Sequence, residues 1–279
     1  MNEPKLKSGL AQIESNYDAF LVDQFGVLRD GRGPYPEAAA TLVALKALGK
    51  KIIILSNSGK RSEENSVRLA QLGFDPQSWD WFLTSGETAW RIMQTETRGS
   101  GQKRCLLISR DNDTSPLDGL DIVRTDSAED ADVILIAASE GDVHTLADYQ
   151  ALLEPAVRRN IPCLCTNPDK IMLTRGGTAF GAGRIAELFE ALGGTVRWIG
   201  KPFPDIYNQA RDFLGNIPPA RICAIGDSVE HDIAGARDAG FASILVTTGI
   251  LEHASPVDRQ NLFEVHQAVP DFILPMFRM

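Results

Sequence analysis

The chain has 279 residues, 43% of them hydrophobic and 23% charged, which is enough apolar material for one large domain or two ordinary ones. Its formal net charge of −9 argues against a protein that binds nucleic acid through clustered lysines and arginines. No segment approaches the roughly 18 uninterrupted apolar residues of a membrane span, and the first residues lack the apolar run of a signal peptide. We therefore expect a cytoplasmic protein whose partners are neither membranes nor nucleic acids.

Apolar runs alternate with helical patterns in the first part of the chain. Strands are expected at Ala19 to Asp23, Lys51 to Leu55 and Trp79 to Leu83. The first two are followed by helical patterns that end at Gly49 and Gly73. This alternation is typical of βαβ units and predicts a parallel sheet.

A glycine-rich, polar stretch after Arg98 suggests a crossing into a second domain. Alternation continues there, so we expect a folded insert with strands at Arg104 to Ser109, Ala131 to Ala137 and Ile161 to Thr166. Its glycine-rich residues 170–183 are expected to lead back toward the first domain. The rest of the pattern consists of a short run at Val196 to Gly200, a helix at Pro204 to Leu214, a strand at Arg221 to Ile225, a helix at Glu230 to Ala239 and a last strand at Ser243 to Thr247. The predicted fold class is α/β, with a parallel-sheet core.

The cysteines are Cys105, Cys163, Cys165 and Cys223. Cys163 and Cys165 have no second Cys or His pair nearby at metal-site spacing. We therefore expect buried free thiols in a reducing compartment.

Polar residues follow several of the expected strands. They are Asp23, Ser56, Lys201 and Asp227. Ligands of open α/β sheets bind beyond the carboxyl ends of the strands, so these side chains are candidates for one site. Each of them alone also fits a helix cap or a turn, and the functional hypothesis therefore rests on the set.

The four residues match what a carboxylate nucleophile for phosphate esters requires. A divalent cation removes the repulsion between carboxylate and phosphate, and Asp23 with Asp227 could supply the oxygen ligands that Mg²⁺ takes. The Lys201 ammonium would offset the remaining phosphate charge, and the Ser56 hydroxyl would donate to a phosphoryl oxygen. Backbone N–H groups of the glycine-containing loop after Asp23 would bind the same anion.

These residues lie in segments that resemble the four ordered motifs of the haloacid dehalogenase superfamily of phosphatases: FLVDQFGVL, IIILSNS, GKPFPDIY and ICAIGDSVEHDIAGARDAG. The likeness is strongest to its class IIA group, the nitrophenylphosphatase and sugar- or nucleotide-phosphatase-like members, to which TSGE and TNPD also point. The resemblance spans nearly the whole chain. It implies a Rossmann-like core of residues 1–88 and 194–279, with an inserted α/β cap domain at 89–193 that selects the substrate.

The resemblance also implies a role for each matching residue. Asp23 corresponds to the phosphorylated nucleophile, the backbone oxygen of Phe25 and the carboxylate of Asp227 to metal ligands, and Asp232 to a group that supports the metal through its waters. The implied phosphate-binding residues are Ser56, Asn57, Gln24 and Lys201. The implied cofactor is Mg²⁺, the partner is a small phosphorylated metabolite such as a sugar or nucleotide phosphate, and the cap is of a kind that mediates homodimers.

The sequence departs from the phosphatase pattern at Phe25. That pattern has a second aspartate there, which acts as general acid and base, and a phenyl ring can do neither. Losing a general acid typically costs about 10²- to 10⁴-fold in rate. The metal ligand at this position is a backbone oxygen, which Phe25 retains. Metal binding should therefore persist although proton transfer is lost.

Three functional interpretations remain open at this point. The protein is a phosphohydrolase for substrates with good leaving groups, or one that borrows an acid; Asp30 is the nearest candidate acid, although it also fits a turn before Gly31. It is a dehalogenase-like enzyme, against which Asp227 and Asp232 argue because a dehalogenase needs no metal. Or it binds a phosphometabolite with little turnover.

Overall fold

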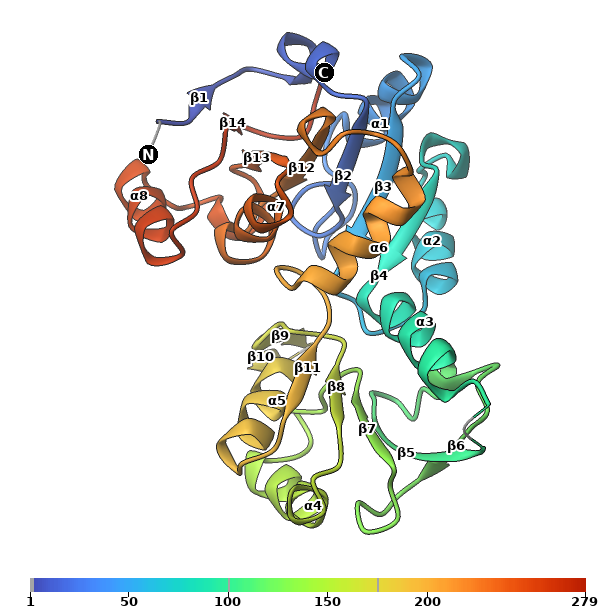
Figure 1. The fold of residues 1–279 in the computed structure, drawn as a ribbon. Helices are drawn as coiled ribbons and strands as arrows, with labels where there is room; N and C mark the ends of the chain where they lie inside the picture. Colours follow the sequence, from blue (N-terminus) through green and yellow to red (C-terminus); the bar gives the residue numbers. More distant parts are fainter. Residues whose placement is uncertain (1–2, 100, 175) are drawn as a thin grey trace. The chain divides into compact units, whose positions relative to one another are not determined.

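A computed structural model describes residues 3–99, 101–174 and 176–279, and these divide into two compact units (Figure 1). The first unit contains the described residues up to Ser56, Glu63–Leu83 and the chain from Lys201 onward. The second contains Asn57–Ser62 and Thr84–Gly200. The domain division expected at residues 88 and 194, with a cap that selects the substrate, stays a prediction.

The first unit is built on a seven-stranded sheet of order β1-β14-β13-β12-β2-β3-β4. Its strands are β1 Lys5–Leu6, β2 Ala19–Asp23, β3 Lys51–Ser56, β4 Trp81–Thr84, β12 Ile222–Gly226, β13 Ala242–Val246 and β14 Phe272–Leu274. The central strand β2 pairs in parallel with β3 on one side and β12 on the other. The helices of this unit are α1 Ala38–Ala47, α2 Ser62–Gln71, α6 Pro204–Leu214, α7 Ala234–Ala239 and α8 Pro256–Val265.

Helices cover both faces of this sheet. Phe20 and Val22 of β2 pack in one apolar cluster with residues of α1 and α2. Ala19 and Leu21, on the opposite face of the strand, pack with residues of α6 and α7. Because successive side chains of a strand alternate between faces, a strand buried on both sides is a continuous apolar run, as in the sequence of β2.

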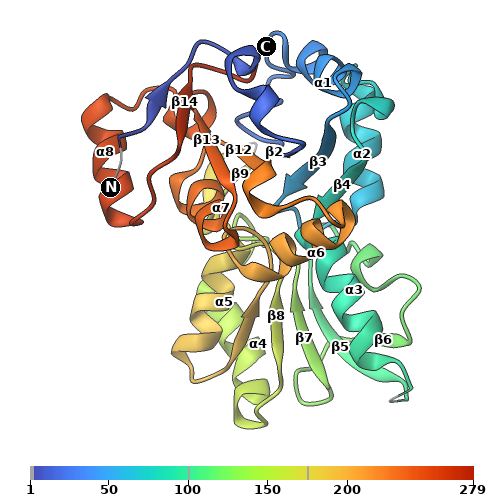
Figure 2. The same ribbon diagram turned by 45° about the horizontal axis from the view of Figure 1, so that its top comes forward.

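The second unit has a five-stranded sheet of order β11-β8-β7-β5-β6, in which the recorded pairings are parallel. Its strands are β5 Lys103–Ile108, β6 Ile122–Thr125, β7 Val133–Ile136, β8 Cys163–Cys165 and β11 Val196–Trp198, and its helices are α3 Ser85–Thr97, α4 Leu146–Arg158 and α5 Ala182–Ala191. The helices α4 and α5 pack on one face of the sheet and α3 packs on the other (Figure 2). The predicted α/β fold class is confirmed.

Two details of the predicted element order are wrong. The strand at 243–247 is not the last, because β14 follows it and pairs with β13. Residues 170–183 do not lead back to the first unit, since they contain the antiparallel hairpin of β9 Ile171–Thr174 and β10 Gly177–Phe180 and are followed by α5 and β11 of the second unit. Both errors concern strands of three or four residues, which are too short for a periodic pattern to emerge.

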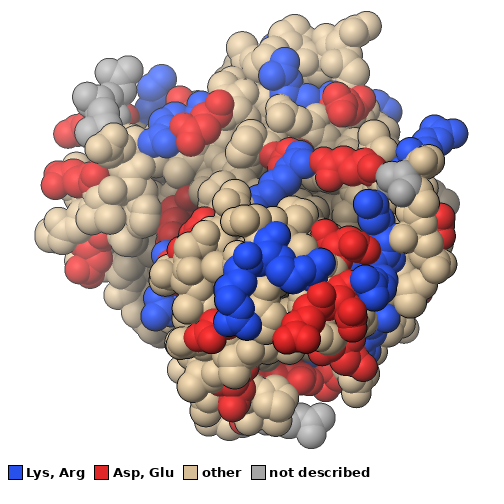
Figure 3. Space-filling model, turned by 60° about the horizontal axis from the view of Figure 1, so that its bottom comes forward, with Lys and Arg blue, Asp and Glu red and all other residues tan. Residues whose placement is uncertain are grey.

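The four cysteines are free and buried, as predicted. None of the helices in the described part of the chain combines the length and the apolar character needed to cross a bilayer. On the face displayed in Figure 3, lysine and arginine side chains are interleaved with aspartate and glutamate side chains.

Candidate active site

The carboxyl ends of three neighbouring strands bring polar side chains to one edge of the first unit's sheet. Asp23 is the last residue of β2, Ser56 is the last residue of β3, and Asp227 follows β12. The parallel register pairs Asp23 with Leu55 of β3, and the preceding residue of β2 with Ile225 of β12. The three side chains therefore start from the edge where open α/β sheets bind ligands.

Lys201 connects two of the acidic residues of this edge. Its Nζ donates to Oδ1 of Asp23 and, at 2.7 Å, to Oδ1 of Asp232. All three side chains are buried. Burial acts to lower the pKa of Lys201, but the two carboxylates raise that pKa above its usual value, so the ammonium stays charged.

Asp23, Asp227 and Asp232 form a carboxylate cluster: each offers one oxygen, and these oxygens lie within 4.8 Å of one another. Burial raises the pKa of Asp227 to about 7, and the neighbouring charge of Asp232 raises it as well. Burial also raises the pKa of Asp23 well above its usual value, although Lys201 opposes this. When all three acids are ionised, their negative charge exceeds the positive charge of the one ammonium. Such an all-oxygen donor set fits a hard divalent cation, whose binding would release protons.

Asp232 is positioned by the turn that opens the last βα connection. The chain after β12 forms a π-helical turn at Val229–Ile233, in place of the regular start expected for a helix at Glu230. The Ser228 N–H donates to Oδ2 of Asp232 at 3.1 Å. A Cβ on Gly226 would lie 2.0 Å from Cγ of Asp232, so this carboxylate packs directly on the end of β12.

Two glycines enclose the carboxylate of Asp227. A Cβ on Gly26 or on Gly249 would lie 1.9 Å from Oδ2 of Asp227, and both glycines have a positive φ, +86° and +66°. The Ile250 N–H donates to the same oxygen at 2.8 Å. The Thr248 hydroxyl donates to the carbonyl of Gly26 at 2.5 Å and so ties the two loops together. Gly249 and Ile250 were not among the residues predicted for the site, since a glycine shortly after a strand end is their only signal in the sequence.

Gly249→Ala is expected to weaken divalent metal binding by about 10-fold, because displacing groups that support a metal ligand costs that much or more. The matched control is Gly240→Ala, at a glycine with φ +74° and no atom within 4 Å of its added Cβ. Backbone strain alone should lower the free energy of unfolding of both variants by about 1 kcal/mol. Calorimetric titration with Mg²⁺ and urea unfolding separate the two effects. Equal metal affinity in the two variants would show that Gly249 does not support Asp227.

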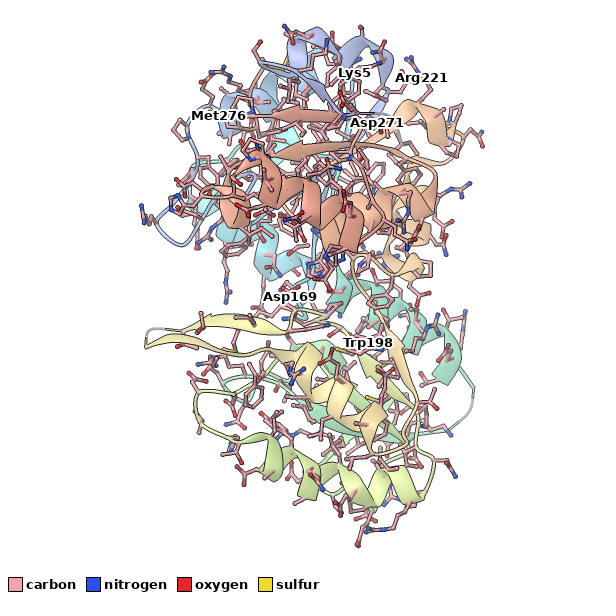
Figure 4. All side chains as sticks on the ribbon, turned by 90° about the vertical axis from the view of Figure 1, so that its left-hand side faces the viewer. Lys5, Asp169, Trp198, Arg221, Asp271 and Met276 are labelled. Carbon is pink, nitrogen blue, oxygen red and sulfur yellow. The ribbon has the colours of Figure 1, made fainter. Side chains whose placement is uncertain are left out.

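The structure places the remaining predicted residues as follows. Gln24 is buried, and its carbonyl accepts the N–H groups of Leu28 and Arg29. Asn57 belongs to the second unit, where its side chain donates to Oδ1 of Asp169 at 3.1 Å. Figure 4 labels Asp169 beside the β9–β10 hairpin. A phosphate-binding role for Gln24 and Asn57 stays a prediction.

Asp30 has the properties of a turn residue. Its Oδ1 accepts the N–H groups of Arg32 at 2.7 Å and Gly33 at 3.0 Å. The hydrogen bond from Arg32, and then that from Gly33, hold the pKa of this partly exposed carboxyl below its usual value. An acid that is ionised and engaged in a turn is a poor proton donor, which favours the turn interpretation of Asp30.

Phe25 does not pack into the core. Its side chain is 51% exposed. The guanidinium carbon of Arg29 lies 4.7 Å from the centroid of its ring. The position that the phosphatase pattern gives to a general acid therefore carries an exposed aromatic ring with a cation over it.

Comparisons with known families place the chain in a class. A model of haloacid dehalogenase-like hydrolases matches residues 20–123, and a second model of that kind matches residues 198–275; together they cover more than half of the chain. The chain belongs to the haloacid dehalogenase-like hydrolases, and the family predicted from its motifs is confirmed.

Particular relatives are similar over most of their length. The D-glycerol 3-phosphate phosphatase of Mycobacterium tuberculosis is 26% identical, over 92% of this chain and 73% of its own. The 4-nitrophenylphosphatase of Schizosaccharomyces pombe is 26% identical, over 86% of this chain and 89% of its own. The crystal structure of a haloacid dehalogenase-like hydrolase from Brucella suis 1330 has a TM-score of 0.82 and 26% identity, covering 97% of this chain and 99% of that chain.

Proposed function

We propose that this hydrolase cleaves phosphate monoesters of small metabolites, with Asp23 as the nucleophile and Mg²⁺ as the cofactor. The observation that carries the proposal is the buried cluster of Asp23, Asp227 and Asp232, with Lys201 bonded to two of its members. Its relatives support the proposal, because two of them are phosphatases that match most of this chain.

The chain's own groups account for the chemistry of the first step. The Asp23 carboxylate attacks phosphorus, the ester oxygen leaves with its electron pair, and an aspartyl phosphate forms. Lys201 orients Asp23 and donates to a phosphoryl oxygen, and the Ser56 hydroxyl at the end of β3 donates to another. Asp23, Asp227 and the carbonyl of Phe25 would hold a divalent cation, and Asp232 would support its waters. Such a cation would offset the repulsion between carboxylate and phosphate. Water then hydrolyses the aspartyl phosphate.

The missing general acid restricts the substrates. The Phe25 ring cannot protonate a leaving oxygen, and Asp30 is committed to its turn. Phenolates, enolates and carboxylates leave from phosphorus without being protonated, whereas the alkoxides of ordinary alcohols do not. We therefore propose that the enzyme prefers phosphate esters with leaving groups of low pKa.

Phe25→Asp is expected to raise kcat/KM on alkyl phosphates by about 10²- to 10⁴-fold, the usual contribution of a general acid. The gain on 4-nitrophenyl phosphate should be much smaller, because that leaving group needs little protonation. Phe25→Asn is the matched control. The asparagine side chain has the same shape as that of aspartate, and the variant loses the same contact with Arg29, but it carries no acid. If the Asn and Asp variants have equal activity on both substrates, our account of the missing acid is wrong.

A phosphate-ester panel, assayed with and without Mg²⁺ on the native protein and on Asp23→Asn, tests the function. Metal-dependent phosphate release by the native protein alone supports it. The exposed ring of Phe25 favours one other candidate, a phosphometabolite-binding protein with little turnover. That candidate predicts a ligand-induced rise in Tm without product.

A further inference from the structure

The loop after Asp23 carries an arginine that has no carboxylate partner within ion-pair distance among the described residues. The guanidinium of Arg29 lies over the ring of Phe25, and its Nε donates to the carbonyl of Asp30 at 3.1 Å. A guanidinium stacked on a ring uses its face for that contact, and its N–H donors point outward in the plane. Neither terminal nitrogen of Arg29 has a hydrogen-bond partner among the described residues, so both are available to a ligand.

Backbone hydrogen bonds and buried neighbours fix this pair in place. The Gly26 N–H donates to the carbonyl of Arg29 at 2.8 Å, and the Arg29 N–H donates to the carbonyl of Gln24 at 3.2 Å. Between them, Val27 and Leu28 are fully buried in the core. The loop can therefore hold this pair, an exposed Phe25 and a partly buried Arg29, without the cost of ordering a flexible segment.

The loop that holds this pair reaches the carboxylate cluster within the first unit. Gly26, the neighbour of Phe25, packs against the carboxylate of Asp227. The cluster contains three acids and the ammonium of Lys201, so a divalent cation brings its formal charge only to neutrality. A dianionic phosphate ester with a further negative group would then need another cation. Arg29, three residues after Gly26 in the same loop, is the candidate for that cation.

We propose that Arg29, positioned by Phe25, binds a carboxylate on the leaving group of the substrate. The planar fork of a guanidinium matches a carboxylate with paired hydrogen bonds. Resting on the proposed function, this inference narrows the substrates to phosphate monoesters whose leaving group is both of low pKa and carboxylated. In this arrangement Arg29 is a specificity residue and Phe25 is a positioning residue.

The test compares 3-carboxyphenyl phosphate with 3-carbamoylphenyl phosphate, which are similar in size but differ by one charge. We expect kcat/KM to favour the carboxylate by about 10-fold or more, as for a hydrogen bond to a charged group. Arg29→Gln should abolish this preference, and Arg29→Lys should retain part of it because an ammonium keeps the charge but not the fork. Arg32→Gln, at an exposed arginine of the same loop, should leave the preference unchanged.

Equal kcat/KM for the two esters, or a preference that survives Arg29→Gln, would overturn the inference while leaving the proposed function intact. Binding is measured separately, as the rise in Tm that each ester causes in the Asp23→Asn background with and without Arg29→Gln. If no ester is hydrolysed, the proposed function fails. In that case a rise in Tm that only the carboxylated ester causes, and that Arg29→Gln removes, supports the inference, and any other result overturns it.

Discussion

Asp23→Asn is expected to reduce phosphate release by about 10⁴-fold or more, the usual loss when a nucleophile is removed. The amide cannot form the phosphorylated intermediate. The fold should survive, because burial raises the pKa of Asp23 and the ionised carboxylate is therefore a cost to the folded protein at neutral pH. In metal-free buffer, Tm should stay unchanged or rise. The measurements are kcat on 4-nitrophenyl phosphate and a thermal melt.

Asp30→Asn is the matched control for this experiment. It makes the same chemical change seven residues further along the chain, at a partly exposed carboxylate that holds a turn. Activity should be retained, which also tests Asp30 as a borrowed acid. If Asp23→Asn turns over at the wild-type rate, or if Asp30→Asn loses most of its activity, Asp23 is not the carboxylate that carries the chemistry.

Lys201→Met is expected to destabilise the metal-free protein by about 3–5 kcal/mol, because it leaves buried carboxylates without a cation. Lys201 is 4% exposed, and Asp23 and Asp232 both accept its hydrogen bonds. Activity should be lost as well. Urea unfolding in the presence of a chelator measures the change in the free energy of unfolding.

Two further variants show whether this loss comes from buried charge. The double variant Lys201→Met/Asp232→Asn should recover part of the stability, since it removes one uncompensated carboxylate. Lys170→Met breaks the ion pair with Glu187, in which the lysine is half exposed, and should cost about 1 kcal/mol or less. If Lys201→Met and Lys170→Met unfold at the same urea concentration, Lys201 does not compensate a buried cluster.

The polar residues at the strand ends were predictable, because a parallel strand that is buried on both faces is an apolar run, and the first polar residue after that run shows where the strand ends. The apolar run of β2 ends at Asp23, and that of β3, which begins after Lys51, ends at Ser56, so both positions could be read from the sequence. Asp227 follows the buried strand β12 in the same way, whereas Lys201 comes three residues after β11, a partly exposed strand of the second unit's sheet. What the pattern could not give is the contact of Gly249 with Asp227, because that contact depends on how two distant loops meet.

Two elements, α3 and β14, were not predicted, each for a specific reason. The helix α3 has a readable start signal, since the Thr84 hydroxyl accepts the N–H of Glu87 at 2.9 Å in the manner of an N-cap. The segment TSGE contains this cap as well as the family motif, but no helix was predicted from it. Strand β14 is three residues long and is followed by Pro275, so neither its length nor its flank favoured a strand.

The most direct test of the account is a rapid-quench reaction with 4-nitrophenyl phosphate and Mg²⁺, followed by mass spectrometry of the acid-quenched protein. Because Phe25 offers no base to activate water, we expect a burst of nitrophenol, slow later turnover and a phosphoryl group on Asp23. Linear product formation from the first turnover with no phosphorylated protein, or a phosphoryl group on any other residue, would contradict the assignment of Asp23 as the nucleophile.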